Sequence, residues 1–422
     1  MEMIFLYGNA LISSIFIIFL LQSKNHIHFI GLILAFFNLT FFSIIPILQV
    51  KLDKFLFLNT QLDSSYIENA ALYCFCSGLC VFFSYVLALE QRESVDNIVA
   101  DDKKAVLSSI IVVIGLLIFI YITIKGSYLT LLIRGADKGI FSVINNQSLA
   151  LIFQNLFRPL TLFLLFYHLS QEASTRKLFL YGGVALLFNS PIGTSRYYAF
   201  CVLSSFLIFY LLYYKKIAFR NFNIVYFLFL LFGTFSSSFF GIFRAWDNYL
   251  EGNYKQNNFI EYVFQGNFDA FENFALSIKM IDKIGYFYGE TFLTALLFFV
   301  PRSFWVDKME GSGAVLFENI LYGGYFAGTN SNIANPLVSE FFINFGFFGI
   351  IMGSIALGIL SARLDNNMKN FASKGNIFMI LSWGFIGSHW LLILRGDFLS
   401  AYAYVSGAIC AYLVFRYRFV IK

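Results

Sequence analysis

Charged residues are scarce in this chain. Only 13% of the 422 residues are charged and 59% are hydrophobic, whereas soluble domains carry roughly 25% charged residues. No stretch is long and polar enough to form a separate soluble domain, so the composition indicates a polytopic membrane protein. The net charge of +5 gives no basis for nucleic-acid binding.

The sequence patterns that bind common cofactors are also missing. There is no P-loop and no glycine-rich dinucleotide fingerprint, so we expect neither ATP nor NAD chemistry. None of the four histidines stands at metal-ligand spacing, and we expect no metal and no other cofactor. The five cysteines all lie in apolar runs, where we expect small apolar packing residues without disulfides.

Long apolar runs are abundant. Because about 20 apolar residues span a bilayer, we predict an all-α membrane protein with eleven spans in one transmembrane domain, residues 1–422. The first run lacks the basic start and cleavage site of a signal peptide, so it is expected to remain as a span. The predicted spans are 3–22, 27–50, 66–89, 105–124, 148–169, 178–193, 197–214, 223–243, 337–360, 375–394 and 398–415.

The basic residues predict which connections face the cytoplasm. Fifteen of the 29 basic residues fall in six short segments on one side of the predicted spans. These are Lys24, Arg92 with Lys103 and Lys104, Arg176 with Lys177, Lys215 with Lys216 and Arg220, Arg363 with Lys369 and Lys374, and Arg416 with Arg418 and Lys422. Basic loops are normally cytoplasmic, so the amino terminus is predicted outside and the carboxyl terminus inside.

The segment 244–336, between the eighth and ninth spans, is the longest predicted outer loop. It contains ten of the 24 acidic residues and many aromatic ones, but little proline or serine, so we expect it to be ordered, with short helices. Within it, Thr291–Val300 is apolar but too short to span, and is predicted to be re-entrant or interfacial. If it spanned, the basic tail would face outward, against the charge rule.

Arginines recur on the predicted outer side, where basic residues are unusual. A guanidinium binds phosphate in a bidentate way, so these arginines predict an outer site for an anionic, lipid-linked substrate. The predicted pyrophosphate-binding residues are Arg158, Arg196, Arg244, Arg302, Lys308 and Arg395. Snorkelling at the membrane edge is the alternative for Arg302 and Lys308, and Arg158 is a mere edge residue if its span begins later.

Carboxylates and one histidine accompany the arginines. Asp397 follows Arg395 at the corner between the last two spans, and Glu340 lies just inside the ninth span. Both are candidate catalytic groups; Asp397 is alternatively the counter-ion of Arg395, and Glu340 a partner of the helix dipole. His389 approaches the outer side and is a positioning candidate, although a hydrogen-bonded helix residue is the plainer interpretation.

Short motifs follow one another in a characteristic order over residues 180–400. They are Gly193/Arg196, Tyr286/Tyr288/Gly289/Thr291, Pro301/Arg302/Trp305/Lys308, Glu340/Asn344/Gly346/Gly349 and a late Arg395. In this order they resemble the O-antigen polymerase family (Wzy type), the oligosaccharide repeat unit polymerases. One position departs from the family pattern, because Met309 stands near the place where many members have a proline.

The resemblance implies a bacterial inner-membrane glycosyltransferase of the multi-span, GT-C-like class. Such enzymes join oligosaccharide units carried on undecaprenyl pyrophosphate at the periplasmic face, and both donor and acceptor are lipid-linked. The arginines would stabilise the leaving pyrophosphate, and Glu340 or Asp397 would activate the acceptor hydroxyl. Tyr288, Trp305, Asn344 and His389 are expected to position the sugars. A chain-length regulator is a further expected partner, by analogy.

Three alternatives compete with a polymerase. O-antigen ligases share the layout but place a histidine in the long outer loop, and residues 244–336 contain none. A flippase or exporter predicts charges deep in several spans and repeat symmetry, without a large ordered outer loop. A structural membrane anchor does not require arginines at four or five outer corners.

Overall fold

Helices make up the computed structural model of this protein. It describes residues 1–55, 62–89, 155, 158–191, 194–236, 268–300, 302–321 and 333–417. Within these ranges the chain forms α-helices and short π-helical segments, and no strand. The predicted all-α architecture is therefore confirmed for this part of the chain.

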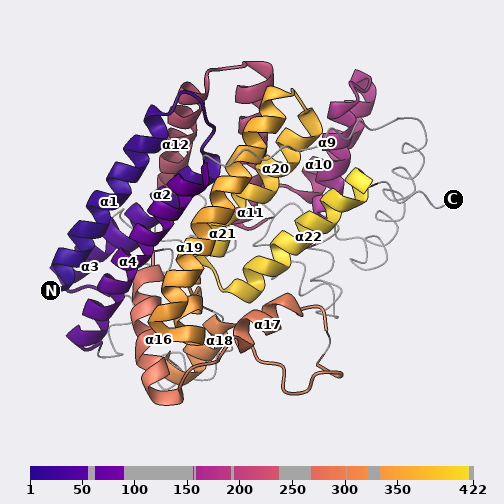
Figure 1. The fold of residues 1–422 in the computed structure, drawn as a ribbon. Coiled ribbons are helices and arrows are strands. Elements are labelled where there is room, and N and C mark those ends of the chain that lie inside the picture. Colours follow the sequence, from indigo (N-terminus) through magenta and orange to yellow (C-terminus); the bar gives the residue numbers. More distant parts are fainter. Residues whose placement is uncertain are drawn as a thin grey trace, which may run out of the picture.

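The first half of the chain supplies long helices and several shorter helical segments (Figure 1). They are α1 (Glu2–Gln22), α2 (Phe29–Leu39), η1 (Thr40–Ile44), α3 (Ile45–Leu52), α4 (Ser64–Leu89), α9 (Arg158–Ser170), α10 (Thr175–Phe188), α11 (Arg196–Phe209), η5 (Tyr210–Tyr214) and α12 (Phe219–Ser236). The π-helical η1 joins α2 to α3 just before Pro46, whose missing N–H interrupts the regular hydrogen bonding.

The second half of the chain combines helices of very different lengths, from five to 37 residues. They are α16 (Ala270–Ile284), α17 (Glu290–Leu296), α18 (Ser312–Leu316), η6 (Phe317–Leu321), α19 (Leu337–Ser373), α20 (Ile377–Ser388), α21 (Trp390–Arg395) and α22 (Phe398–Tyr417). The short helices α16, α17 and α18 lie together at one end of the molecule (Figure 1). They belong to the long segment for which the sequence predicts short helices.

Seven helical segments in the described ranges are long and apolar enough to cross a membrane. They are Glu2–Gln22, Phe29–Leu52, Ser64–Leu89, Arg196–Tyr214, Leu337–Ser373, Ile377–Arg395 and Phe398–Arg416. Each corresponds to a predicted span: the first, second, third, seventh, ninth, tenth and eleventh. The chain is thus a helical membrane protein with several candidate spans.

For three other predicted spans, the part that the structure describes contains a shorter helix. The helix α9 has 13 residues and α10 has 14, and the apolar part of α12 is Phe219–Gly233. The sixth span was predicted to reach residue 193, but α10 ends at Phe188. Pro191 explains this end, because the residue before a proline is pushed out of the helical region. The predicted span 105–124 lies outside the described residues.

The ninth span extends further than predicted. The prediction ended it at residue 360 and put Arg363 and Lys369 in a loop, yet both lie on α19. Asp365, Met368 and Phe371 are buried at a spacing of three residues, so a buried helical face continues beyond the apolar run. Hydropathy underestimates the helix because its last turns carry polar residues.

A break divides α19 after its first two turns. Phe345 and Gly346 have non-helical dihedral angles, and Gly346 has φ 61° and ψ −151°, a region that only glycine enters without strain. Phe341 then lies against Gly349, although eight residues of straight helix rise about 12 Å. The first two turns therefore fold back sharply, and a side chain at Gly349 would not fit.

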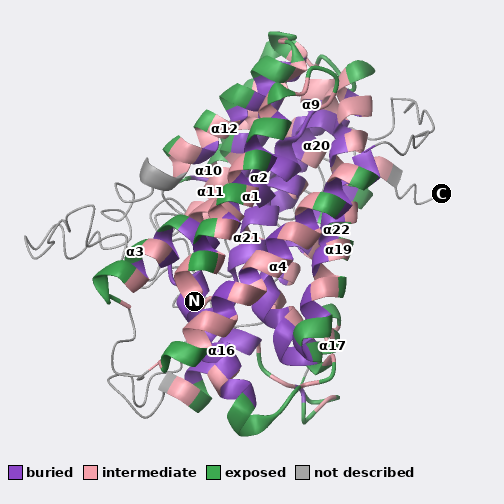
Figure 2. Cartoon of the chain, turned by 60° about the vertical axis from the view of Figure 1, so that its left-hand side comes forward, coloured by how far each residue is buried: buried purple, intermediate pink, exposed green. Residues whose placement is uncertain are grey.

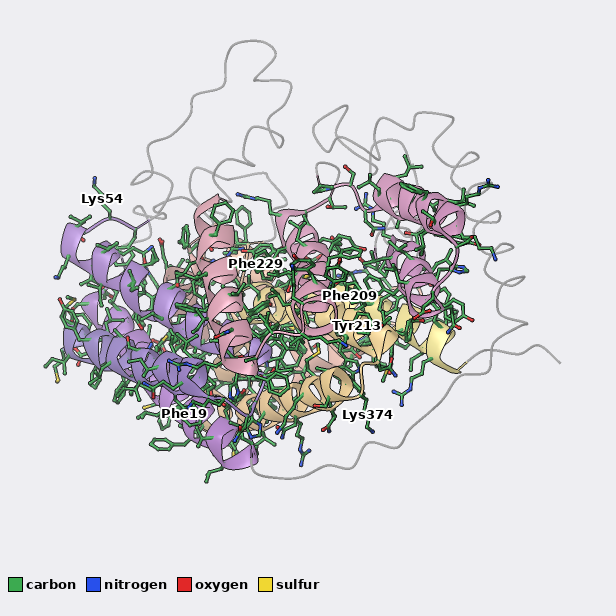
Figure 3. The ribbon with its side chains drawn as sticks, turned by 90° about the horizontal axis from the view of Figure 1, so that it is seen from above. Phe19, Lys54, Phe209, Tyr213, Phe229 and Lys374 are labelled. Atoms are coloured by element: carbon green, nitrogen blue, oxygen red, sulfur yellow. The ribbon has the colours of Figure 1, made fainter. Side chains whose placement is uncertain are left out.

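Aromatic residues fill the space between the helices. Phe163, for example, meets Phe166 and Phe385 edge to face at centroid distances of 5.5 and 5.9 Å. Figure 3 shows the helices surrounded mainly by carbon atoms. Polar contacts are few but specific: Ser77 on α4 and Ser354 on α19 join their hydroxyl oxygens at 2.7 Å. The abundance of phenylalanine therefore reflects packing, as its apolar character suggested.

Several of the predicted cytoplasmic segments meet at one end of the bundle. Asn223 Nδ2 donates to the carbonyl oxygens of Leu20 and His26, both at 3.1 Å. Burial, and then the charge of Lys369, lower the pKa of His26. Lys374, beyond the same end of α19, and Lys54, after α3, lie at opposite margins of the view from above (Figure 3).

Candidate functional site

Glu340 is the centre of a buried polar cluster beside α17 and α18. Its side chain is 1% exposed. Thr291 Oγ1 donates to Oε2 at 2.9 Å, and Ser312 Oγ donates to Oε1 at 2.5 Å. The backbone N–H of Phe398 also points to Oε1, at 3.3 Å. The carboxylate therefore joins α17, α18 and α22, and two of its donors are hydroxyls that can rotate.

Asn344, one turn after Glu340, fixes the neighbouring hydroxyl. Its Nδ2 donates to Thr291 Oγ1 at 2.6 Å and to the Glu340 carbonyl oxygen at 2.8 Å. Its Oδ1 accepts from the backbone N–H of Gly289 at 2.8 Å. Asn344 thereby holds the start of α17 against the folded-back turns of α19. These contacts are all within the protein, and the positioning of sugars by Asn344 stays a prediction.

Asp397 shares Ser312 with Glu340. Asp397 Oδ1 accepts from Ser312 Oγ and from the N–H of Gly313, both at 3.3 Å. Its Oδ2 accepts from Ser400, through the N–H at 3.2 Å and the hydroxyl at 3.0 Å. The α18 segment approaches so closely that a Cβ on Gly311 would lie 2.6 Å from the carboxylate oxygens. A single hydroxyl therefore links the two candidate catalytic carboxylates.

Arg395 forms a buried ion pair two residues before Asp397. Its Nη2 lies 2.8 Å from Asp269 Oδ1, and both side chains are largely buried. The guanidinium carbon also lies 5.6 Å from the ring centroid of Tyr197. Burial raises the pKa of Asp269 although the charge of Arg395 opposes the shift. Asp269 is thus a counter-ion of Arg395, a role for which the sequence had suggested Asp397.

The amino-terminal end of α11 brings a second arginine to this region. Arg196 is its first residue, and Ser195 caps it by accepting from the N–H of Tyr198 at 3.2 Å. Tyr197, the next residue, is the one that packs against Arg395. Arg196 therefore begins the helix whose next residue packs against Arg395. Gly193, the glycine of the predicted corner, lies outside the described residues.

Arg158 and His389 lie near Tyr198, the third residue of α11. The Tyr198 hydroxyl donates to Asn189 Oδ1 at 2.6 Å, and the charge of Arg158 acts on this phenol. The rings of Tyr198 and His389 have centroids 6.3 Å apart. His389 Nδ1 lies 2.8 Å from the Phe385 carbonyl oxygen, so the interpretation as a hydrogen-bonded helix residue fits. Arg158 begins α9 as described and is buried.

Lys308 is the clearest correction to the predicted anion site. Its Nζ donates to the carbonyl oxygens of Leu297, Phe298 and Val300, at 3.0, 2.8 and 2.9 Å. An ammonium group has three N–H donors, so all of them go to the backbone after α17. Burial, and then the charge of Arg302, lower the pKa of Lys308. Lys308 therefore caps a loop, and we remove it from the predicted pyrophosphate contacts.

The residues around Lys308 form an exposed loop. Arg302 Nη1 donates to the Lys308 carbonyl oxygen at 2.8 Å, and Nη2 lies 3.5 Å from Glu310 Oε1. Lys308 Nζ lies 6.0 Å from the ring centroid of Trp305. Tyr288 is 80% exposed, ahead of α17. These predicted site residues are thus outside the buried cluster, and Arg244 lies outside the described residues.

Several residues of the cluster were not singled out as functional from the sequence. Thr291 stood within a quoted motif, but only the structure shows its hydroxyl on Glu340. Nothing in the sequence pointed to Ser312 as a site residue, because it lies outside the motifs, four residues after Lys308. Asp269 was one of ten acidic residues in a long segment. Asn335 Nδ2 donates to Ser312 Oγ at 2.9 Å, and its place just before the ninth span was the available hint.

The comparisons with known proteins give no relative. No family model, no curated protein and no solved structure matches the chain. Among the residues that the structure describes, no group of three or more histidine, cysteine or acidic side chains is placed to hold a metal ion.

Proposed function

We propose that this protein is a membrane glycosyltransferase that polymerises lipid-linked oligosaccharide repeat units, as its resemblance to O-antigen polymerases implies. The observation that carries the proposal is the corner of Arg395, Gly396 and Asp397. It joins a buried guanidinium, paired with Asp269, to a buried carboxylate cluster. Two residues extend at most about 7 Å, so the two kinds of charge lie within the reach of one substrate.

The arginine side of this corner suits a pyrophosphate leaving group. In the proposed reaction, the bond between the sugar C1 atom and the lipid pyrophosphate oxygen breaks, and negative charge develops on that oxygen. Arg395 is already oriented by Asp269 and Tyr197, so little reorganisation is needed to stabilise that charge. Arg196 at the start of α11 adds a second cation. Backbone N–H groups at a helix start also favour anions.

The carboxylate side suits activation of the acceptor. The acceptor hydroxyl oxygen forms the new bond to C1, and its proton passes to a carboxylate, for which Glu340 is our candidate. The hydroxyls of Thr291 and Ser312 can rotate away from Glu340 when substrate arrives. Asp397, held by the backbone of Gly313 and Ser400, is the fixed partner of the pair. Proton transfer of this kind contributes typically 10²- to 10⁴-fold to a rate.

The location follows from the same proposal. We place the protein in the bacterial inner membrane, with eleven spans in a GT-C-like arrangement and the cluster facing the periplasm. Undecaprenyl-pyrophosphate-linked oligosaccharides would be donor and acceptor, and a chain-length regulator a further partner. The basic connections on the opposite side support this orientation.

The test is restoration of polysaccharide ladders in a polymerase-null strain that makes the matching repeat unit. Wild type is compared with Arg395→Ala, Arg196→Ala and Glu340→Gln at equal membrane levels. Arg176→Ala is the matched control, because Arg176 is an exposed arginine in a predicted cytoplasmic connection. We expect a ladder from wild type and from the control, and a single repeat unit from the three variants.

The other outcomes separate the alternatives. A wild-type protein that makes no ladder in the matching background contradicts the polymerase, and ligase or exporter activity is then measured in the same strain. Normal ladders from all three variants would keep polymerisation but remove these residues from the site. Release of undecaprenyl pyrophosphate by purified protein in lipid vesicles gives a readout that does not depend on export.

A further inference from the structure

The short helix α17 buries polar side chains and exposes apolar ones. Thr291 and Thr294 are buried against the protein, whereas Leu293 and Leu296 are exposed. In water a helix hides its leucines and exposes its hydroxyls, so this arrangement fits a non-aqueous surrounding. With seven residues, α17 is about 10 Å long and cannot cross a bilayer.

The loop after α17 carries the same apolar surface further. Phe299, Phe304 and Val306 are 67%, 85% and 77% exposed. The loop is nevertheless well ordered, because the ammonium of Lys308 holds three of its carbonyl oxygens and Arg302 holds a fourth. Large apolar side chains thus point outward from a backbone that these hydrogen bonds hold in place. Figure 2 shows this loop mainly exposed, and α17 exposed on one part of its surface, at the end of the molecule.

This apolar surface adjoins an exposed apolar stripe on a candidate membrane span. On α19, a candidate span, Phe348, Met352 and Leu360 are exposed along one stripe at multiples of four residues. The helix α17 packs beside the start of this stripe. Phe292 lies 6.5 Å from Phe345 between ring centroids and 5.3 Å from Phe398 at the start of α22. The exposed stripe of α19 and the exposed face of α17 are therefore adjacent.

We infer that α17 and the described residues that follow it, 297–300 and 302–306, form an interfacial element that inserts its apolar side chains into the phospholipid bilayer. Leu293, Leu296, Phe299, Phe304 and Val306 would contact acyl chains. Arg302, which is about half exposed, lies within this segment, where a guanidinium can reach lipid phosphates while its stem stays in apolar surroundings. Aromatic and basic residues of this kind are enriched at membrane boundaries.

Insertion of α17 into the bilayer would bring the buried cluster close to lipid. Thr291, on the inner face of α17, donates its hydrogen bond to Glu340. The carboxylate is then one helix away from lipid, and a movement of α17 within the bilayer would uncover it from the side. The membrane insertion itself does not depend on the proposed function, because it rests on exposure and packing alone.

The test measures membrane depth with spin labels. The five cysteines are replaced by alanine, and single cysteines are introduced by Phe304→Cys, Leu296→Cys, Phe348→Cys and Lys283→Cys. Phe348 is the positive control on the α19 stripe, and Lys283 is an exposed residue in the last turn of α16. Each labelled protein is reconstituted into phosphatidylethanolamine–phosphatidylglycerol vesicles. Collision rates are then measured with oxygen, which enters lipid, and with a water-soluble nickel chelate.

Labels at 296, 304 and 348 are expected to collide more with oxygen, and the label at 283 more with the nickel chelate. A label at 304 that behaves like the one at 283 would overturn the inference. Low collision rates with both reagents would overturn it as well, because protein would then cover the loop. Quenching of Trp305 by brominated lipids, in protein with the three other tryptophans replaced by phenylalanine, checks the result without a cysteine at the loop.

Discussion

Two buried carboxylates on the same helix, Glu340 and Asp365, differ in the groups that donate hydrogen bonds to them. Glu340 accepts from the hydroxyls of Thr291 and Ser312, which belong to helices of seven and five residues. Asp365 accepts from the backbone N–H groups of Ile30 and Gly31, both at 2.9 Å, in the first turn of α2. Glu340 thus accepts from two rotatable hydroxyls and one backbone N–H, whereas Asp365 accepts from two backbone N–H groups and the hydroxyl of Tyr85.

Asp365 is the centre of a structural network. The Tyr85 hydroxyl donates to Asp365 Oδ2 at 2.5 Å, and His28 Nδ1 lies 2.8 Å from the same hydroxyl. A phenol has one proton, so His28 must donate its Nδ1 proton to Tyr85. Asp365 thus connects α19 to α2 and α4. It also accepts hydrogen bonds from N–H groups at the start of α2, which have no partner within that helix. Backbone donors suit stability, whereas rotatable donors suit a group that exchanges partners with substrate.

The largest expected effect is on activity. Glu340→Gln keeps the size of the side chain but removes its ability to take a proton. If the proposed function holds, polymerisation in vesicles should fall about 10²- to 10⁴-fold, with little change in thermal stability. Both quantities are measured on the same purified preparation. Equal activity of wild type and variant would mean that Glu340 takes no part in proton transfer and that its role, like that of Asp365, is structural.

The next largest effect is on stability. Asp365→Ala leaves two backbone N–H groups and the Tyr85 hydroxyl without an acceptor in a buried site. Unsatisfied buried donors cost about 1–3 kcal/mol each, so we expect a loss on the order of 3 kcal/mol. The measurement is thermal unfolding in detergent, followed by gel filtration. Asp365→Asn, which retains one acceptor oxygen, should lose less; an unchanged unfolding temperature for the alanine variant contradicts the role.

A smaller and local effect is expected at Lys308. Lys308→Met removes the group that holds the carbonyl oxygens after α17. We expect amide exchange over 290–300 to speed up by about 10-fold, because the loop opens more often. Hydrogen exchange with mass spectrometry reads this out, and Glu310→Gln, at an exposed contact of Arg302, is the control. Equal protection in variant and wild type would return Lys308 to the candidate phosphate ligands.

The smallest effect is expected from Tyr85→Phe. The change removes one hydrogen bond to Asp365 while both backbone donors stay in place. A net loss of about 1 kcal/mol is expected, well below that of Asp365→Ala. The same thermal measurement distinguishes the two. A loss as large as that of Asp365→Ala would mean that the phenol, and not the helix start, is the main partner of the carboxylate.

The spans were the most predictable part of the fold. Seven predicted spans correspond to helices because transfer of about 20 apolar residues into lipid is a local property of the sequence. The failures have identifiable reasons. Pro191 follows the early end of α10, and the buried face through Asp365 lengthens α19. Neither depends on average hydropathy, so a window average does not detect them.

The candidate site was predictable only in part. Glu340, Asn344, Asp397 and Arg395 were named from the sequence, and the structure brings them to one region. Lys308 was assigned to phosphate because a lysine after an arginine suggests an anion site, yet its donors are used by backbone carbonyls. Sequence position says which residues are near the membrane edge, but not which partners their side chains have.

The sequence by itself determined that this is a helical membrane protein and which residue types lie near the ends of its apolar runs. Both follow from local chemistry, since hydropathy and charge act on each segment as it meets the bilayer. Only the tertiary structure decided that Ser312 links Glu340 to Asp397, 28 and 85 residues away, and that Asp269 pairs with Arg395 across 126. These pairings arise from the fold of α19 at Gly346 and from the packing of separate helices, and neither is a property of any single segment.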